Sequence, residues 1–365
     1  MAGSFETAGT HDPHALVQST TPDPDLVEML TDLFADYRQT RPTPSAIIDF
    51  DPALWGRLEE LGLTRLTASE ASGGSGASWV EAAALLGLAA GAAAPVPLAE
   101  HDILAAWLLE SAGLPNDGRL RTACRPDPAG NALNVTFGRD VASLVALWED
   151  GEQWRVADVP ADRVRITEHR NLAGEPSDTV EFDLADLGSG VVVPDDIGDQ
   201  FHLRGALARS AQVCGGLERI LELVLTHTAE RVQFGRPIGR FQLVQGLVAD
   251  LAAEAALARA ATDTAVARAA ASDWQDPGML FAVGVAKSCV GHASSVVVRN
   301  AHEVLGAIGT TVEHELQLLT KPVLVRRSEF GSVHEWDETL MRLAASAGRD
   351  RLWSLITTGR AAAQP

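Results

Sequence analysis

The stretch AERVQFGRPIGRFQLVQGLVADLAAE, residues 229–254, decides the fold. Before it, apolar residues recur on one face of a predicted helix at positions Leu217, Ile220, Leu221 and Val224. Glycine and proline at 235, 237 and 239 then break the helix, since proline cannot continue its hydrogen-bond ladder. A second amphipathic helix follows, with Phe241, Val244, Val248, Leu251 and Ala255 on one face. The sequence therefore predicts two long helices joined at a tight corner.

The corner places a cation, an amide and an aromatic ring close together, at Arg231, Gln233 and Phe234. The planar guanidinium of arginine binds phosphate through two hydrogen bonds, so the three residues suit a phosphate-bearing ligand. The alternative is structural: Arg231 pairs with Glu230 or Asp250, and Phe234 fills the corner.

The pattern E-R-x-Q-F-G-x-P-I-x-x-F-Q-x-x-Q-x-x-x-A-D resembles a segment of the acyl-CoA dehydrogenases, which joins two long helices of their C-terminal domain. In that family the equivalent residues reach across a subunit interface to the diphosphate and adenosine of FAD. The resemblance implies this role for Arg231, Gln233 and Phe234.

Composition narrows the class of protein. The chain has 365 residues, 46% of them hydrophobic and 21% charged, which is typical of a globular protein with a helical bias. A net charge of −20 argues against nucleic-acid binding. Three scattered cysteines, no recognisable signal peptide and no apolar run longer than residues 82–94 favour a cytoplasmic protein without a membrane span. The histidines lack metal-ligand spacing, so we expect no metal site.

The order of predicted elements is helical, then β, then helical. We expect a flexible tail at residues 1–23, an N-terminal helical domain at 24–118, a reduced antiparallel β domain at 119–197 and a C-terminal four-helix bundle at 198–365. The bundle helices are predicted near residues 202–230, 241–272, 277–306 and 336–358. Asp150-Gly151 predicts a hairpin turn. The resulting fold, mainly α with a central β domain, is similar to that of the acyl-CoA dehydrogenases.

In this family a glutamate removes the α-proton of an acyl-CoA thioester, and it occupies one of two sequence positions. One position corresponds here to Gly205, which has no side chain to act as a base. The other falls at Phe330, next to Glu329. Glu329 is therefore the candidate base, and the alternative is that it forms an ion pair with Arg326 or Arg327.

Two more departures concern the flavin. The β domain lacks the T-E-P-x-A-G-S-D-like loop that contacts the flavin ring in the family. Glu303 stands where a glutamine contacts the FAD diphosphate, and a carboxylate there needs a partner, for which His302 is the candidate. The resemblance implies a set of candidate FAD contacts: Arg231, Gln233, Phe234, Phe241, Glu303 and Gly306.

The chain thus resembles the non-catalytic partner subunit of actinobacterial α2β2 acyl-CoA dehydrogenases of steroid side-chain degradation. The resemblance implies a homologous partner subunit that supplies the catalytic glutamate, FAD shared at the interface, an acyl-CoA substrate and an electron acceptor. Two alternatives stay open: a self-sufficient dehydrogenase that uses Glu329, and a structural homologue without flavin.

Overall fold

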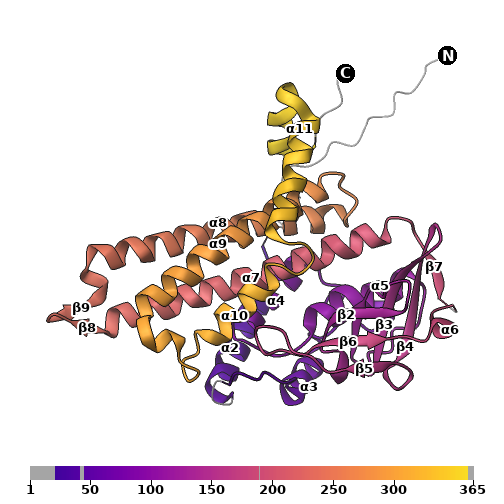
Figure 1. Cartoon of the computed structure of the whole chain (residues 1–365), viewed down its shortest axis with the longest axis horizontal. Coiled ribbons are helices and arrows are strands. Elements are labelled where there is room, and N and C mark those ends of the chain that lie inside the picture. Colours follow the sequence, from indigo (N-terminus) through magenta and orange to yellow (C-terminus); the bar gives the residue numbers. More distant parts are fainter. Residues whose placement is uncertain (1–20, 42–44, 189, 361–365) are drawn as a thin grey trace.

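The computed structural model describes residues 21–41, 45–188 and 190–360. The predicted tail at residues 1–23 falls almost entirely outside this range. Within it the protein is mainly α-helical with a small central β domain (Figure 1), so the predicted fold class is confirmed. The exact domain boundaries stay a prediction.

The N-terminal region is helical, and its helix starts follow from local capping. Its main helices are α2 (Pro24–Thr40), α3 (Pro52–Glu60), α4 (Trp79–Gly91), the π-helix η2 (Ala99–Ala106) and α5 (Trp107–Ser111). Asp23 and Asp51 cap α2 and α3, each of which begins with a proline, and Ser78 forms a capping box with Glu81.

In the residues that the structure describes, the β domain consists of seven short strands in two sheets. The first sheet has the order β1-β3-β4-β7 and the second β2-β6-β5, with strands β1 (Arg121–Cys124), β2 (Asn131–Thr136), β3 (Ser143–Asp150), β4 (Gln153–Pro160), β5 (Arg165–Thr167), β6 (Ser177–Glu181) and β7 (Val191–Val193). The predicted hairpin joins β3 to β4, with Gly151 in the left-handed region at φ 67°. The β domain is antiparallel as predicted except at one strand pair: β1 pairs parallel to β3 after the chain crosses through β2 in the other sheet.

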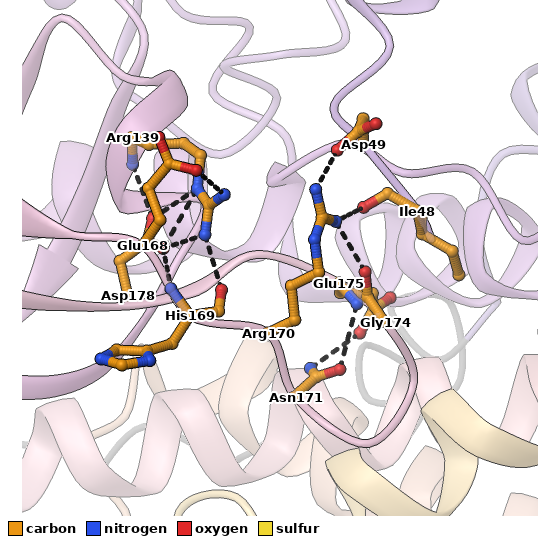
Figure 2. A network of polar contacts seen from close by, with 10 residues as sticks. All are labelled: Ile48, Asp49, Arg139, Glu168, His169, Arg170, Asn171, Gly174, Glu175 and Asp178. Carbon is orange, nitrogen blue, oxygen red and sulfur yellow. Dashed lines mark hydrogen bonds and ion pairs between the residues drawn. The ribbon is translucent and has the colours of Figure 1, made fainter. Parts of the chain in front are cut away.

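Arginines fix the β domain internally and to the N-terminal region (Figure 2). Arg139 contacts Asp178 and the Glu168 carboxylate, the latter at 2.6 Å. Arg170 forms an ion pair with Asp49 and donates to the Ile48 carbonyl at 2.8 Å. These contacts hold the loop before β6 against the segment that leads into α3.

In the described part of the C-terminal region the four predicted helices are present as α7 (Ile197–Glu230), α8 (Gln242–Ser272), α9 (Met279–Leu305) and α11 (Val333–Thr358), and a shorter helix, α10 (Gln317–Arg326), lies between the last two in sequence. Sequence reasoning missed α10, which contains Pro322 and has no apolar stripe. In Figure 1, α7, α8 and α9 lie side by side along the long axis, and α11 projects from the body.

Helix α7 is the central element, because it contributes to two hydrophobic cores. Phe201 and Leu207 pack with the N-terminal helices, whereas Leu217 and Val224 pack with α8, α9 and α10. Where α7 crosses α4, a Cβ on Gly215 would lie 1.9 Å from the Gly87 carbonyl oxygen, so the close crossing requires glycine.

Helix α9 is long and apolar enough to cross a membrane by length and composition alone. Its most apolar window is 56% buried within the described chain. This burial is typical of a core helix.

Candidate functional site

The corner between α7 and α8 is a two-stranded hairpin at one extreme of the long axis (Figure 1). Strands β8 (Val232–Gln233) and β9 (Arg236–Pro237) pair antiparallel. The two residues at its tip, Phe234 and Gly235, have φ angles of 51° and 79°. Two successive positive φ angles are typical of the tightest hairpin turns, and they carry a cost for the phenylalanine.

The three predicted ligand-binding side chains of this corner point away from the chain's own core. Phe234 is 92% exposed, and Arg231 and Gln233 are also exposed. Within the described residues, the Arg231 guanidinium has no hydrogen bond or ion pair, so the alternative pairing with Glu230 or Asp250 is not observed. A free cation beside an exposed ring at a strained turn is an arrangement that an external ligand would complete.

Phe241 is placed beside the tip. Its ring lies 6.2 Å from that of Phe234 in an edge-to-face arrangement, and the Arg236 guanidinium lies 4.2 Å above it. The Phe241 side chain therefore packs against two residues of the hairpin, Phe234 and Arg236.

Glu303 and Gly306, the other two candidate FAD contacts, lie where α9 ends. This end is held beside the start of α8, since Asn300 donates to the Leu247 carbonyl at 3.4 Å. The candidates therefore share one end of the bundle with the hairpin. The expected Glu303–His302 pair is not found: Glu303 is exposed, and the buried His302 Nδ1 has no hydrogen-bond partner among the described residues.

The two family positions for the catalytic base meet in the interior, although they lie far apart in the sequence. A Cβ on Gly205 would lie 2.2 Å from Cε1 of Phe330, so the ring fills the space that a side chain at position 205 would need. The Phe330 ring also packs edge-to-face on Phe201 at 5.9 Å. Its carbonyl accepts a hydrogen bond from Trp336 at 2.9 Å. One family position is therefore occupied by a glycine and the other by a phenylalanine, whose ring leaves no room for a side chain at position 205.

Glu329, the candidate base, forms an ion pair with Arg209 of α7. The same guanidinium contacts Glu100 of η2 at 2.5 Å and Gln212 at 2.8 Å. Burial lowers the pKa of Arg209, but the two carboxylates raise it more, so the arginine stays charged. The predicted alternative partners of Glu329 are wrong, because Arg326 pairs with Glu175 instead, at 2.7 Å.

Arg209 and Glu100 were not predicted from the sequence. The available signal was the run Glu100-His101-Asp102 inside an otherwise apolar helix, since buried charges are rare unless they are paired.

A pocket of about 470 Å³ opens beside this cluster, between the β domain, η2, α7 and the end of α10. Its polar lining includes Thr122, Thr136, Asn171, Ser177, Arg209 and Glu329. Phe330 forms part of its apolar wall. The only carboxylates that line it belong to the Arg209 cluster, so no unpaired acid faces the pocket among the described residues.

Lys287 fixes the segment that carries Glu329 and Phe330. It is 1% exposed, and its Nζ donates to the carbonyls of Arg326, Arg327 and Glu329 at 3.4, 3.1 and 2.7 Å. Burial lowers its pKa to about 7. An ammonium that caps three carbonyls holds the loop in one conformation.

Within the described ranges, no group of three or more histidine, cysteine, aspartate or glutamate side chains is placed to hold a metal ion.

The chain is similar in sequence to acyl-CoA dehydrogenases. Residues 202–334 match the acyl-CoA dehydrogenase C-terminal domain. The chain is 28% identical over 304 residues to the acyl-CoA dehydrogenase IpdE2 of Mycolicibacterium smegmatis, which covers 81% of this chain and 89% of that protein.

Solved structures share the fold at lower identity. The ChsE4-ChsE5 complex from Mycobacterium tuberculosis matches at 21% identity with a TM-score of 0.77, over 89% of this chain and 98% of that one. The Tcur3481-Tcur3483 steroid acyl-CoA dehydrogenase variant matches at 21% identity with a TM-score of 0.74, over 91% and 99%. A glutaryl-CoA dehydrogenase from Mycobacterium smegmatis, solved in complex with FADH2, matches at 15% with a TM-score of 0.71, over 97% and 98%.

The predicted recognition and the predicted enzyme type are therefore confirmed at the level of the family. The chain is therefore similar to the acyl-CoA dehydrogenases in sequence and in fold, and its residues 202–334 match their C-terminal domain.

Proposed function

We propose that this chain is the non-catalytic subunit of a heteromeric acyl-CoA dehydrogenase. A homologous partner subunit holds most of the FAD and supplies the catalytic glutamate. This chain contacts the same FAD across the subunit interface, through the hairpin at the α7–α8 corner. The complex introduces an α,β double bond into a CoA thioester, and the substrate class that the similar complexes suggest is a steroid side-chain thioester.

The observation that carries the proposal is the state of Arg231. An arginine that the fold uses for its own stability is paired, as Arg209, Arg121 and Arg139 are. Among the described residues, the Arg231 guanidinium has no ion pair and the Phe234 side chain is 92% exposed, so neither side chain stabilises the core. A guanidinium and a ring held together by a short hairpin suit a diphosphate next to a ring system.

The residues at this corner fit the diphosphate and adenosine part of FAD. Arg231 would pair with the diphosphate, Gln233 would donate or accept a hydrogen bond, and Phe234 would cover a ring or ribose face. The exposed Glu303 does not fit a diphosphate, because two anions repel one another. The chemistry that FAD supplies when bound is acceptance of a hydride from the acyl-CoA.

The interior supports a non-catalytic role. No side chain can project from position 205 without displacing Phe330. Glu329 is held by the buried guanidinium of Arg209, so its carboxylate is not free to reach a substrate. A homologous partner must then bring the base.

The rival function, a self-sufficient dehydrogenase, rests on the place of Glu329 in the wall of the 470 Å³ pocket. It requires Glu329 to leave Arg209 during turnover. Glu329→Gln in the complex separates the two functions: activity should persist in the partner-subunit case and be lost in the rival case.

The proposal is tested by co-expression with a homologous acyl-CoA dehydrogenase chain and by the ratio of flavin absorbance to protein. We expect flavin in the complex and none in this chain purified alone. Arg231→Ala should lower the flavin content of the complex about tenfold, the size expected for the loss of a charge-assisted pair. Arg349→Ala, which removes an exposed guanidinium of α11, is the matched control and should keep full flavin content.

A chain that is yellow and active by itself would overturn the partner role. Unchanged flavin content in the Arg231→Ala complex would overturn the role of the corner. The absence of flavin both alone and in the complex would favour the structural homologue.

A further inference from the structure

Arg204, the residue before Gly205 on α7, lies between two indole rings. Its guanidinium carbon is 4.3 Å from the centre of the Trp107 ring and 4.6 Å from that of Trp274. Trp274 in turn packs edge-to-face on Trp79 at 4.7 Å. The N–H groups of a guanidinium point outward in its own plane, so an acceptor for Arg204 has to approach in that plane, past the two rings.

This arginine has no polar partner within residues 21–41, 45–188 and 190–360. It is 9% exposed, and none of these residues accepts a hydrogen bond from it or pairs with it. Its Nε and the nearby Trp274 Nε1 are buried donors without an acceptor. Burial lowers the pKa of Arg204 to about 9, which the charge of Asp273 opposes. An unpaired buried cation is costly, so an acceptor from outside would stabilise it.

Arg204 lines a pocket of about 490 Å³ between η2, α5, α7 and the end of α8. Trp79, Trp107, Ala269 and Ala270 supply apolar wall, and Thr67, Ser78, Gln200 and Gln275 supply polar groups. This pocket is separate from the one that Glu329 lines, since the two share no residue.

The other charged groups that line the pocket are acids, and they limit what it can bind. Asp102 accepts from the backbone N–H groups of Thr67 and Ala68, and burial raises its pKa to about 7. Glu110 accepts from Ser69 at 3.0 Å. Asp273 is exposed, and its carboxylate has no hydrogen-bond partner among the described residues, whereas its backbone N–H donates to the Ala269 carbonyl at the end of α8. With one cation and three acids, the pocket can accept one negative charge but repels a second.

We propose that this pocket binds a monocarboxylate with an apolar body. The carboxylate accepts in-plane hydrogen bonds from Arg204, and the apolar body contacts the tryptophan walls. Dianions such as phosphate and sulfate are disfavoured, because their second negative charge is repelled by the acids that line the pocket.

The test measures melting temperature against concentration for the full chain, in the assembly in which it is purified. The probes are benzoate, hexanoate and acetate, compared with phosphate and sulfate, with ionic strength held constant by sodium chloride. Binding to the folded state raises the melting temperature, and at a given ligand concentration the rise is larger for a tighter ligand. We expect benzoate and hexanoate to stabilise, acetate to stabilise less, and phosphate and sulfate to match sodium chloride.

Three variants test whether the rise in melting temperature comes from binding at Arg204. Arg204→Met removes the guanidinium and should weaken benzoate binding at least about tenfold. Asp273→Asn keeps the side-chain shape and tolerates the left-handed backbone (φ 45°), and it should tighten binding roughly fivefold by removing the nearest competing charge. Arg349→Met is the control for loss of a guanidinium elsewhere and should respond like the wild type.

The proposal is overturned if the wild type responds to no monocarboxylate, or if phosphate stabilises as well as benzoate. It is also overturned if Arg349→Met loses the response equally. Should Arg204→Met fail to fold, Asp273→Asn decides alone, and unchanged affinity in that variant counts against the site.

Discussion

The hairpin corner and the Gly205–Phe330 interior use the same residue types in opposite ways. At the corner, Arg231 is unpaired and Phe234 is exposed. In the interior, Arg209 is shared by two carboxylates and Phe330 fills the space above a glycine. The Gly205–Phe330 interior is packed and ion-paired, whereas the side chains of Arg231 and Phe234 are left out of the cores that the described residues form. This difference is the one that the proposed function requires: the corner is open to a ligand, and the interior serves stability.

The largest effect on stability should come from Arg209→Met. It leaves Glu100 buried without its partner, and breaking one side of a buried ion pair costs about 3–5 kcal/mol. Urea unfolding followed by circular dichroism measures the loss. Arg57→Met, which breaks the exposed pair with Asp36, is the control and should cost less than about 1 kcal/mol. Equal costs for the two variants would contradict the assigned role of the interior.

Gly205→Ala comes next. Its methyl group meets the Phe330 ring, and overpacking of this kind costs about 1–3 kcal/mol. The double variant with Phe330→Ala should cost less than the sum of the two single changes, because the smaller side chain admits the methyl group. Additive costs in this cycle would show that the two positions do not compete for space.

Lys287 should make stability depend on pH. Its folded pKa of about 7 lies below the value of 10.5 for the unfolded chain, so the unfolded state binds more protons between these values. The free energy of unfolding contributed by this group therefore rises with pH from about 7 to 10.5. Lys287→Met should flatten that rise in urea unfolding across this range. Lys321→Met, whose partly exposed Nζ contacts Gln317, should keep the rise.

The smallest effect on stability should come from Phe234→Ser. Its side chain is 92% exposed, so the free energy of unfolding of the isolated chain should change by no more than about 0.5 kcal/mol. The same change should lower the flavin content of the co-expressed complex. A large loss of stability in the isolated chain would mean that the corner belongs to the fold after all.

The sequence by itself determined the corner, the order of helical and β regions, and the absence of a side chain at position 205. These are local properties: glycine and proline break helices, apolar residues repeat with the period of a helix, and a glycine has no side chain wherever it is placed. The spacing of Arg231, Gln233 and Phe234 along a few residues also placed them together without knowledge of the rest of the chain.

Tertiary structure alone decided which charges are paired and which rings are buried. The partner of Glu329 is 120 residues away at Arg209, and the neighbouring arginines that sequence proximity suggested point elsewhere. The parallel β1–β3 pair, helix α10 and the Arg204 cluster likewise depend on contacts between distant segments. Local sequence cannot specify them, because burial and pairing are set by how the elements pack against one another.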